Sequence, residues 1–282
     1  MSDWLYRLQN LDRRVLYALL VAVLVLPMVV PIRQPVHVFP RTQALYDFIE
    51  SAPEDETRKD KIVLLLADWG GGSKGENWPQ TEAVIEHMLR RGVKFAIMGV
   101  DPVGVALAHQ MAQKHSRRYG RTYGQDWVNF GYKPLPGQAM LSFASDIQGT
   151  VERDVNYDPL DQLPLMKSVH SMDDVSLLYE VSAAPGIMAW IGLVQPTYET
   201  PMAFGCTAVC APEVMPYLDS GQLIGLLVGM AGGAEYEALL DSPRQATQAL
   251  PMLSLSHVLI IVLVILGNIG YVITRARSRE GS

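Results

Sequence analysis

Hydrophobic and polar positions alternate along residues 61–245 in a pattern that predicts strands separated by helices. An apolar run at 62–67 (IVLLLA) is typical of a strand that is buried on both faces, and an amphipathic stretch with helical period follows at 81–91. The same succession recurs at 95–100 and 102–118. Because parallel neighbours need crossover connections, the alternation predicts a mainly parallel, Rossmann-like, doubly wound α/β sheet.

The remainder of this region repeats the pattern less regularly, between long loops rich in aromatic residues, glycine and proline. Further strands are expected at 127–130, 165–170, 175–181 and 202–209, and further helices at 139–148, 186–194 and from 212 onward. One α/β domain is therefore expected over residues 61–245. The segment before it, 33–60, is polar and proline-containing, and we expect a linker with one or two helical turns that contributes nothing to the core.

Two uncharged apolar runs, at 15–32 and 253–274, flank this region, and each is long enough to span about 30 Å of hydrocarbon. Charged residues make up 18% of the chain, below the usual quarter for a soluble domain, which also favours a lipid bilayer as partner. A cleaved signal peptide is the alternative for the first run. That run is longer than a signal core and no A-x-A-like site follows it before Arg33, so an uncleaved anchor is favoured.

Arginines around the two runs predict the orientation of the chain, since basic residues are retained on the cytoplasmic side. More arginines precede the first run than follow it, and more follow the second run than precede it. Both comparisons place the termini, residues 1–14 and 275–282, in the cytoplasm. Residues 33–252 are then extracytoplasmic.

Overall charge and cysteine content exclude some classes of protein. A net charge of −6 argues against nucleic-acid binding, which requires a basic surface. Two cysteines are too few for a disulfide framework, and no neighbouring ligands complete a tetrahedral metal site around them. We therefore expect no cofactor and no bound metal.

A glycine-rich loop, DWGGGSKGENW, follows the first predicted strand at the edge where open parallel sheets bind ligands. It lacks both the G-x-x-x-x-G-K-[ST] and the G-x-G-x-x-G pattern, so a nucleotide site is disfavoured. A strand-to-helix loop that is either flexible or in contact with a partner is favoured instead. Trp69 and Trp78 flank the glycines and are candidate interface residues, unless both rings cover the end of the sheet.

Two sets of side chains offer weak catalytic or ligand-binding candidates. Cys206 and His170 each end an apolar run and would serve a thiol hydrolase, although a cysteine within a strand is more often a small buried hydrophobe. Asp68, Asp101 and Asp146 would form a carboxylate cluster that binds a divalent cation or another ligand. Aspartate after a strand is equally well explained as a helix N-cap.

Glycines recur every four residues at Gly221, Gly225, Gly229 and Gly233, within an otherwise apolar segment. If this segment is one helix, the glycines line one face and allow another backbone to approach closely, either in the core or between subunits. Asn268 in the second apolar run is expected to face another helix. These features favour a homo-oligomer or association with other membrane subunits.

The sequence therefore favours a non-enzymatic, membrane-anchored scaffold or binding component of an oligomeric or larger membrane complex. The alternative is a membrane-tethered hydrolase of the Cys206–His170 type or of the carboxylate-bound metal type. An extracytoplasmic sensor of a small ligand is a third hypothesis, but the cytoplasmic ends are too short to hold a signalling domain.

Overall fold

The computed structural model describes residues 12–30, 32 and 34–280, and the chain divides into two units. Val36–Thr247 form an α/β domain, and the two ends of the chain, Met1–Pro35 and Gln248–Ser282, form the second unit. Most of the expected cytoplasmic N-terminus, together with residues 31, 33, 281 and 282, lies outside the described residues.

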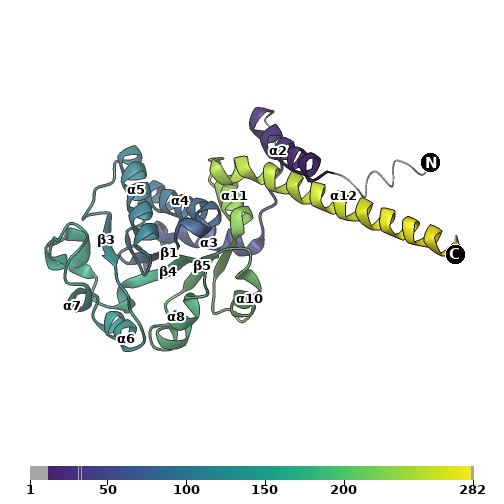
Figure 1. The fold of residues 1–282 in the computed structure, drawn as a ribbon. Coiled ribbons are helices and arrows are strands. Elements are labelled where there is room, and N and C mark those ends of the chain that lie inside the picture. The colour runs from purple at the N-terminus through teal and green to yellow at the C-terminus, as the bar shows by residue number, and fades with distance from the viewer. Residues whose placement is uncertain (1–11, 31, 33, 281–282) are drawn as a thin grey trace. The chain divides into compact units, whose positions relative to one another are not determined.

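Six parallel strands form the sheet of the domain, in the order β3-β2-β1-β4-β5-β6 (Figure 1). The strands are β1 (Ile62–Asp68), β2 (Phe95–Gly99), β3 (Trp127–Tyr132), β4 (Val175–Ser182), β5 (Met202–Cys206) and β6 (Gly225–Val228). The order of the strands reverses between β1 and β4, as in doubly wound sheets. The predicted parallel α/β architecture is confirmed.

Helices cover both faces of the sheet because alternate side chains of its strands are apolar on both sides. One face carries α3 (Pro40–Glu50), α4 (Lys74–Arg91), α5 (Pro102–Tyr119) and α11 (Gly229–Leu239). The other face carries α6 (Gln138–Ser145), α7 (Ile147–Val151), α8 (Ile187–Leu193) and α10 (Ala211–Asp219). A short helix, α9 (Gln195–Tyr198), follows α8.

Helix α3 belongs to the core, so the expectation that residues 33–60 contribute nothing to it is wrong. Pro40 begins the helix, where a missing backbone N–H costs no hydrogen bond. Leu45 and Ile49, one turn apart, are buried in the apolar layer that also contains α4 and α11. At its first turn, Thr42 Oγ1 donates a 2.6 Å hydrogen bond to Glu235 of α11. This amphipathic stretch is too short for its period to stand out in the sequence.

Two predicted strands differ in the structure. The strand expected at 165–170 is a 3₁₀ helix, Pro164–Ser168, in which neighbouring Leu165 and Met166 are both buried. A loop that packs into the core buries consecutive residues, and Pro164 favours a turn at its start. The strand expected at 202–209 ends at Cys206, where the chain turns toward α10.

The recurring glycines do not lie on one helix, so that prediction is wrong. Gly221 adopts a left-handed turn (φ 78°), Gly225 begins strand β6, and α11 starts only at Gly229. At Gly225 the α3 backbone lies so close that an added Cβ would be 2.7 Å from Leu45 Cβ. An apolar segment with glycines fits a short buried strand as well as a helix, and pairing with β5 decided the outcome.

Two apolar helices, α2 (Arg13–Val29) and α12 (Gln245–Glu280), occupy the ends of the described chain. Among the described residues, only the part of α12 over Gln245–Val272 is long and apolar enough, by length and composition, to cross a membrane. This agrees with the apolar run expected at 253–274. A span at 15–32 is not confirmed.

Gly225→Ala should destabilise the domain, because the new methyl group would meet Leu45 Cβ and the Arg41 carbonyl oxygen, 3.1 Å away. Overpacking of this kind typically costs about 1–3 kcal/mol. Chemical denaturation followed by circular dichroism measures the change. Gly192→Ala in α8 is the control, since an added Cβ there has no neighbour within 4 Å. Equal stability of the two variants would show that α3 does not press on β6.

Candidate functional site

The carboxyl ends of β1 and β4 lie side by side at the point where the strand order reverses. Asp68, the last residue of β1, is in register with Ser182, the last residue of β4. In open parallel sheets, ligands bind in the crevice beyond this edge, between the loops that leave the two strands. The acidic side chains near this point therefore form the candidate functional site.

Asp68 is partly buried at this edge and holds the end of β2. Its Oδ1 accepts a 2.6 Å hydrogen bond from the backbone N–H of Val100. The pKa of Asp68 is raised to about 6, chiefly by burial; the Val100 hydrogen bond opposes the shift and the nearby Asp101 carboxylate adds to it. Asp68 also lines a hollow of about 40 Å³ with Lys133 and Trp190, which has room for a few water molecules but not for an organic ligand.

Glu180, in the middle of β4, is the least expected residue near this edge. It is 1% exposed, and neither of its carboxyl oxygens has a hydrogen-bond partner among the described residues. Burial raises the pKa of Glu180 well above its ordinary value, and Asp68 adds to the effect. The environment of Glu180 therefore favours its protonated, neutral form. Gly186 at the start of α8 lies directly against it, where a Cβ would collide with Oε1.

An unpartnered buried carboxyl group costs stability, and such groups concentrate at functional sites. Sequence reasoning did not select Glu180, although a single acidic residue within the apolar run LLYEV was a usable signal. Its significance depends on its neighbour Asp68, which comes from a distant part of the chain.

The other two acidic candidates serve as helix caps. Asp101 Oδ1 accepts hydrogen bonds from the backbone N–H groups of Val103, at 2.8 Å, and Gly104, at 3.3 Å, at the start of α5. Asp146 accepts from Gly149 N–H, at 2.8 Å, at the start of α7. No group of three or more His, Cys, Asp or Glu residues among those described is arranged to hold a metal ion. The structure brings Asp68 and Asp101 together, without Asp146.

The two tryptophans beside the glycine-rich loop pack against each other, with ring centroids 6.4 Å apart. Trp69 is 1% exposed, and its Nε1–H donates to Thr81 Oγ1 at 3.0 Å. Trp78 is partly buried and donates to Glu82 at 2.9 Å. The prediction that Trp69 is exposed at an interface is therefore wrong, because its ring is buried in the apolar layer that also contains α3, α4, α5 and α11.

His170 and Cys206 lie at opposite ends of the parallel strands. Cys206 ends β5 and is in register with Ser182 at the carboxyl end of β4, whereas His170 precedes the amino end of that strand. Cys206 is fully buried, and burial raises the pKa of its thiol to about 12. The fold does not bring the two side chains together as a nucleophile and its base.

A second polar cluster surrounds the start of α12. Glu237 of α11 is buried and accepts hydrogen bonds from the backbone N–H groups of Arg244, Ala246 and Thr247, at 2.8, 3.1 and 2.9 Å. Thr247 Oγ1 donates a further bond to it at 2.7 Å. A carboxylate that satisfies the unpaired N–H groups of a first turn stabilises the helix start. The candidate membrane helix therefore begins within the hydrogen-bond network of the domain.

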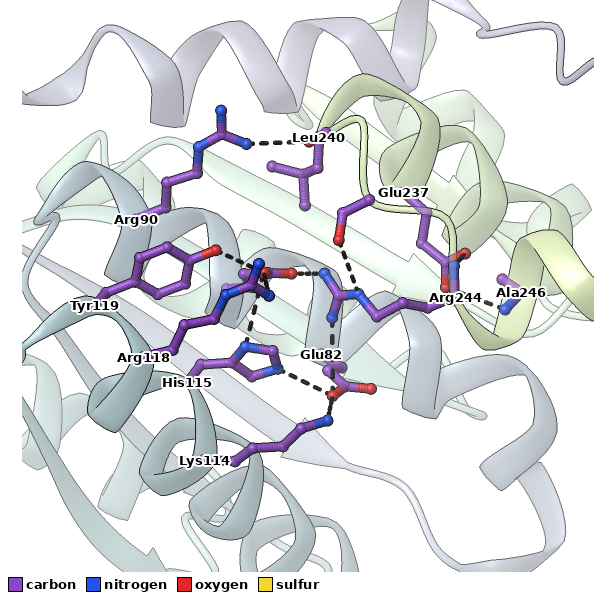
Figure 2. Close-up of polar contacts among 12 residues, drawn as sticks. Glu82, Arg90, Lys114, His115, Arg118, Tyr119, Glu237, Leu240, Arg244 and Ala246 are labelled. Atoms are coloured by element: carbon purple, nitrogen blue, oxygen red, sulfur yellow. Dashed lines mark hydrogen bonds and ion pairs between the residues drawn. The ribbon is translucent and has the colours of Figure 1, made fainter.

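Arg244 extends this cluster toward α4 and α5, as Figure 2 shows. Its guanidinium forms an ion pair with Glu86 and lies 3.8 Å from Glu82. Lys114 and His115 of α5 also contact Glu82, at 2.8 and 3.0 Å. Burial alone would raise the pKa of Glu82, but hydrogen bonds, chiefly from His115, hold it below its ordinary value. Removing one partner would leave a buried charge uncompensated, which is strongly destabilising.

Comparison with known proteins does not assign the chain to a family. No family model matches it. A search of curated proteins likewise found no match. Since a fold alone does not determine function, the functional argument rests on the geometry of these residues.

Glu180→Gln should remove a dependence of stability on pH. In the wild type, the unfolded chain releases the Glu180 proton above the ordinary pKa of 4.5, while the folded protein retains it. The contribution of Glu180 to the free energy of unfolding is therefore fully present below that pH. It is lost as the pH rises toward the raised pKa of the folded protein. At pH 8 the neutral variant should melt at least about 3 °C above the wild type, and near pH 4 the two should coincide.

Differential scanning calorimetry of the full chain from pH 4 to 8 measures this difference. Glu213→Gln, at an exposed position of α10, is the control and should follow the wild type. If the melting temperatures of the wild type and Glu180→Gln change with pH in parallel, Glu180 is ionised, or partnered, in the folded protein.

Proposed function

We propose that this protein is a membrane-anchored α/β binding component of an oligomeric or larger membrane complex, without catalytic activity of its own. The observation that carries the proposal is the continuity of α12. Its first residues, up to Thr247, belong to the domain, and the same helix continues as the candidate membrane span. The helix that follows the last turn of the domain is therefore the same helix that is apolar enough to cross a membrane.

The proposal includes two membrane spans, at 15–32 and 253–274, with both termini in the cytoplasm and the domain on the other side. Its support is the agreement between the arginine distributions at the two runs, because two spans place both ends of a chain on one side. Helix α2 adds many exposed apolar side chains, among them Tyr17, Val21 and Leu24. Such a surface requires lipid or protein to cover it.

Assembly within the membrane is supported by two neighbouring residues of α12. An added Cβ at Gly267 meets nothing within 4 Å, so this position presents a small, open surface to another helix. Asn268 donates from Nδ2 to the Val264 carbonyl oxygen at 2.8 Å and remains exposed, which places a polar amide on the same stretch. Small and polar residues are the usual contacts between membrane helices.

One observation favours an enzymatic alternative. Asp68 and Glu180 are neighbouring carboxyl groups with raised pKa values toward the carboxyl ends of β1 and β4, and paired acids of this kind transfer protons in many active sites. A membrane-tethered hydrolase would then use this pair rather than Cys206 and His170. A hydrolytic activity lost in Glu180→Gln, with the fold retained, would decide for the enzyme.

The mass of the detergent-extracted particle tests the proposed assembly. Native mass spectrometry of the wild type should show more than one subunit, and Asn268→Leu should shift the particle toward the monomer. Loss of an interhelical hydrogen bond costs about 0.6 kcal/mol on average and up to about 2 kcal/mol. Val262→Leu, an apolar exchange on the same helix, is the control. A wild-type monomer with no associated subunit would contradict the proposal.

Cysteine labelling tests the proposed orientation. Both native cysteines are buried, so introduced thiols react without background. Ser51→Cys, at an exposed position after α3, should react with a membrane-impermeant maleimide in intact cells, whereas Ser278→Cys should react only after the membrane is permeabilised. The reverse pattern would invert the orientation, and labelling of both would exclude two spans.

A further inference from the structure

Two adjoining hollows lie along α5, on the side that faces β3 and the loop 153–158. The first has a volume of about 450 Å³ and includes Val105, Tyr132 and Val155 in its lining. The second, of about 320 Å³, is lined by more polar residues. His109 and Asn156 line both, so the two hollows adjoin. Each is large enough for part of a small organic molecule, and together they match the usual size of a ligand site.

Two buried polar atoms in the lining of the second hollow have no hydrogen-bond partner among the described residues. They are Ser116 Oγ and Trp127 Nε1, on side chains that are 5% and 2% exposed. An indole N–H can only donate, and a hydroxyl group can donate as well as accept. Buried donors without a partner are rare in folded proteins. The oxygen atoms of a bound ligand would satisfy both.

The second hollow is also cationic. Arg117 is exposed on its rim and pairs with no carboxylate in the part of the chain that the structure describes. Arg121 lies beside it, with Nη1 3.7 Å from Asp126 and Nε donating to the Leu89 carbonyl oxygen. Arg117 therefore provides an unpaired positive charge beside the two donors.

The acidic residue Asp154 contacts two residues of the lining and already has its own donors. Asp154 is 5% exposed and accepts hydrogen bonds from Tyr123 Oη at 2.5 Å, Asn156 N–H at 2.9 Å and Asp158 N–H at 2.9 Å. Asn156 Nδ2 donates to it as well, at 3.3 Å. Four donors stabilise this carboxylate in its charged form, so its oxygens are already engaged, whereas the guanidinium of Arg117 has no carboxylate partner among the described residues.

Aromatic rings form the wall between the two hollows. The His109 ring centroid lies 5.2 Å from that of Trp127, and the Tyr123 and Trp127 centroids are 4.8 Å apart. Burial lowers the pKa of His109, although Asp154 opposes the shift, so the imidazole is neutral near pH 7. It therefore acts as a flat wall rather than as a third cation, and planar apolar groups pack well against such surfaces.

We propose that these hollows bind a small organic anion whose charged group contacts Arg117, Ser116 and Trp127 and whose aromatic or apolar body lies against Val105 and Tyr132. The site is separate from the Asp68–Glu180 edge and from the start of α12. It does not depend on membrane insertion or on assembly. A single charged group fits the guanidinium of Arg117, and the mainly apolar surface of the first hollow disfavours a second charge.

Phenyl phosphate is the probe, titrated by calorimetry against the full chain in phosphatidylcholine nanodiscs. Arg117→Ala and Gln113→Glu, both at exposed positions of α5, remove a positive charge from the second hollow or add a negative one. Each should weaken binding at least about fivefold, as expected for the loss of a charge-assisted contact. Lys167→Ala removes an exposed positive charge outside the hollows and should leave the affinity within about twofold of the wild type.

Three further ligands separate the contributions of charge and apolar body. Phenylacetate should compete with phenyl phosphate, because both are anions with an aromatic ring. Inorganic phosphate and benzyl alcohol, which each carry only one of the two features, should bind at least about tenfold more weakly. The proposal is overturned if phenyl phosphate does not bind below about 10 mM, if all three variants bind it equally, or if inorganic phosphate binds as tightly.

Discussion

The parallel pairing of β1 with β4 is the constraint on which the rest of the domain depends. Both strands are buried along nearly their whole length, so each requires an apolar layer on both faces. Parallel neighbours also require crossover helices, which supply those layers. Because the strands are parallel, their carboxyl ends all lie on the same side of the sheet. Asp68 and Glu180, far apart in the sequence, become neighbours for this reason.

Close backbone approach completes the layer that contains α3, α4, α5 and α11. Gly225 allows α3 to lie directly on the edge strand β6, and Gly229, with φ 59°, allows the sharp change from β6 into α11. Thr42 and Glu235 then join the two helices by a buried hydrogen bond. Through these contacts, a segment that precedes the first strand becomes part of the core.

Helix α4 connects the two polar regions of the domain. It is about 27 Å long and follows the glycine-rich loop that leaves Asp68, and its middle turns carry Glu82 and Glu86 to the guanidinium of Arg244. The acidic edge and the start of α12 are thus built on one rigid element. Buried charges in such a network are stable only when all partners are present, which favours one arrangement of α4, α5 and the segment before α12.

Local pattern alone determined the strands at 62–67, 95–100 and 175–181, the helix at 102–118 and the second apolar run, because long runs of one period leave few alternatives. It also identified Asp68 at the strand edge. The segment at 221–234 was ambiguous, since glycine with apolar residues suits either a strand or a helix. Only the free edge of β5 decided between them.

The pairs of residues that define the sites could not be predicted from the sequence, for a similar reason. Glu180 of β4 gains its importance from Asp68 of β1, and Ser116 and Arg117 of α5 gain theirs from Trp127 of β3. Conversely, the separation of His170 from Cys206 follows from the direction of β4. His170 precedes the amino end of this strand, and Cys206 lies beside its carboxyl end. Sequence determined which elements form, whereas burial and strand order, which act between distant segments, decided which side chains meet.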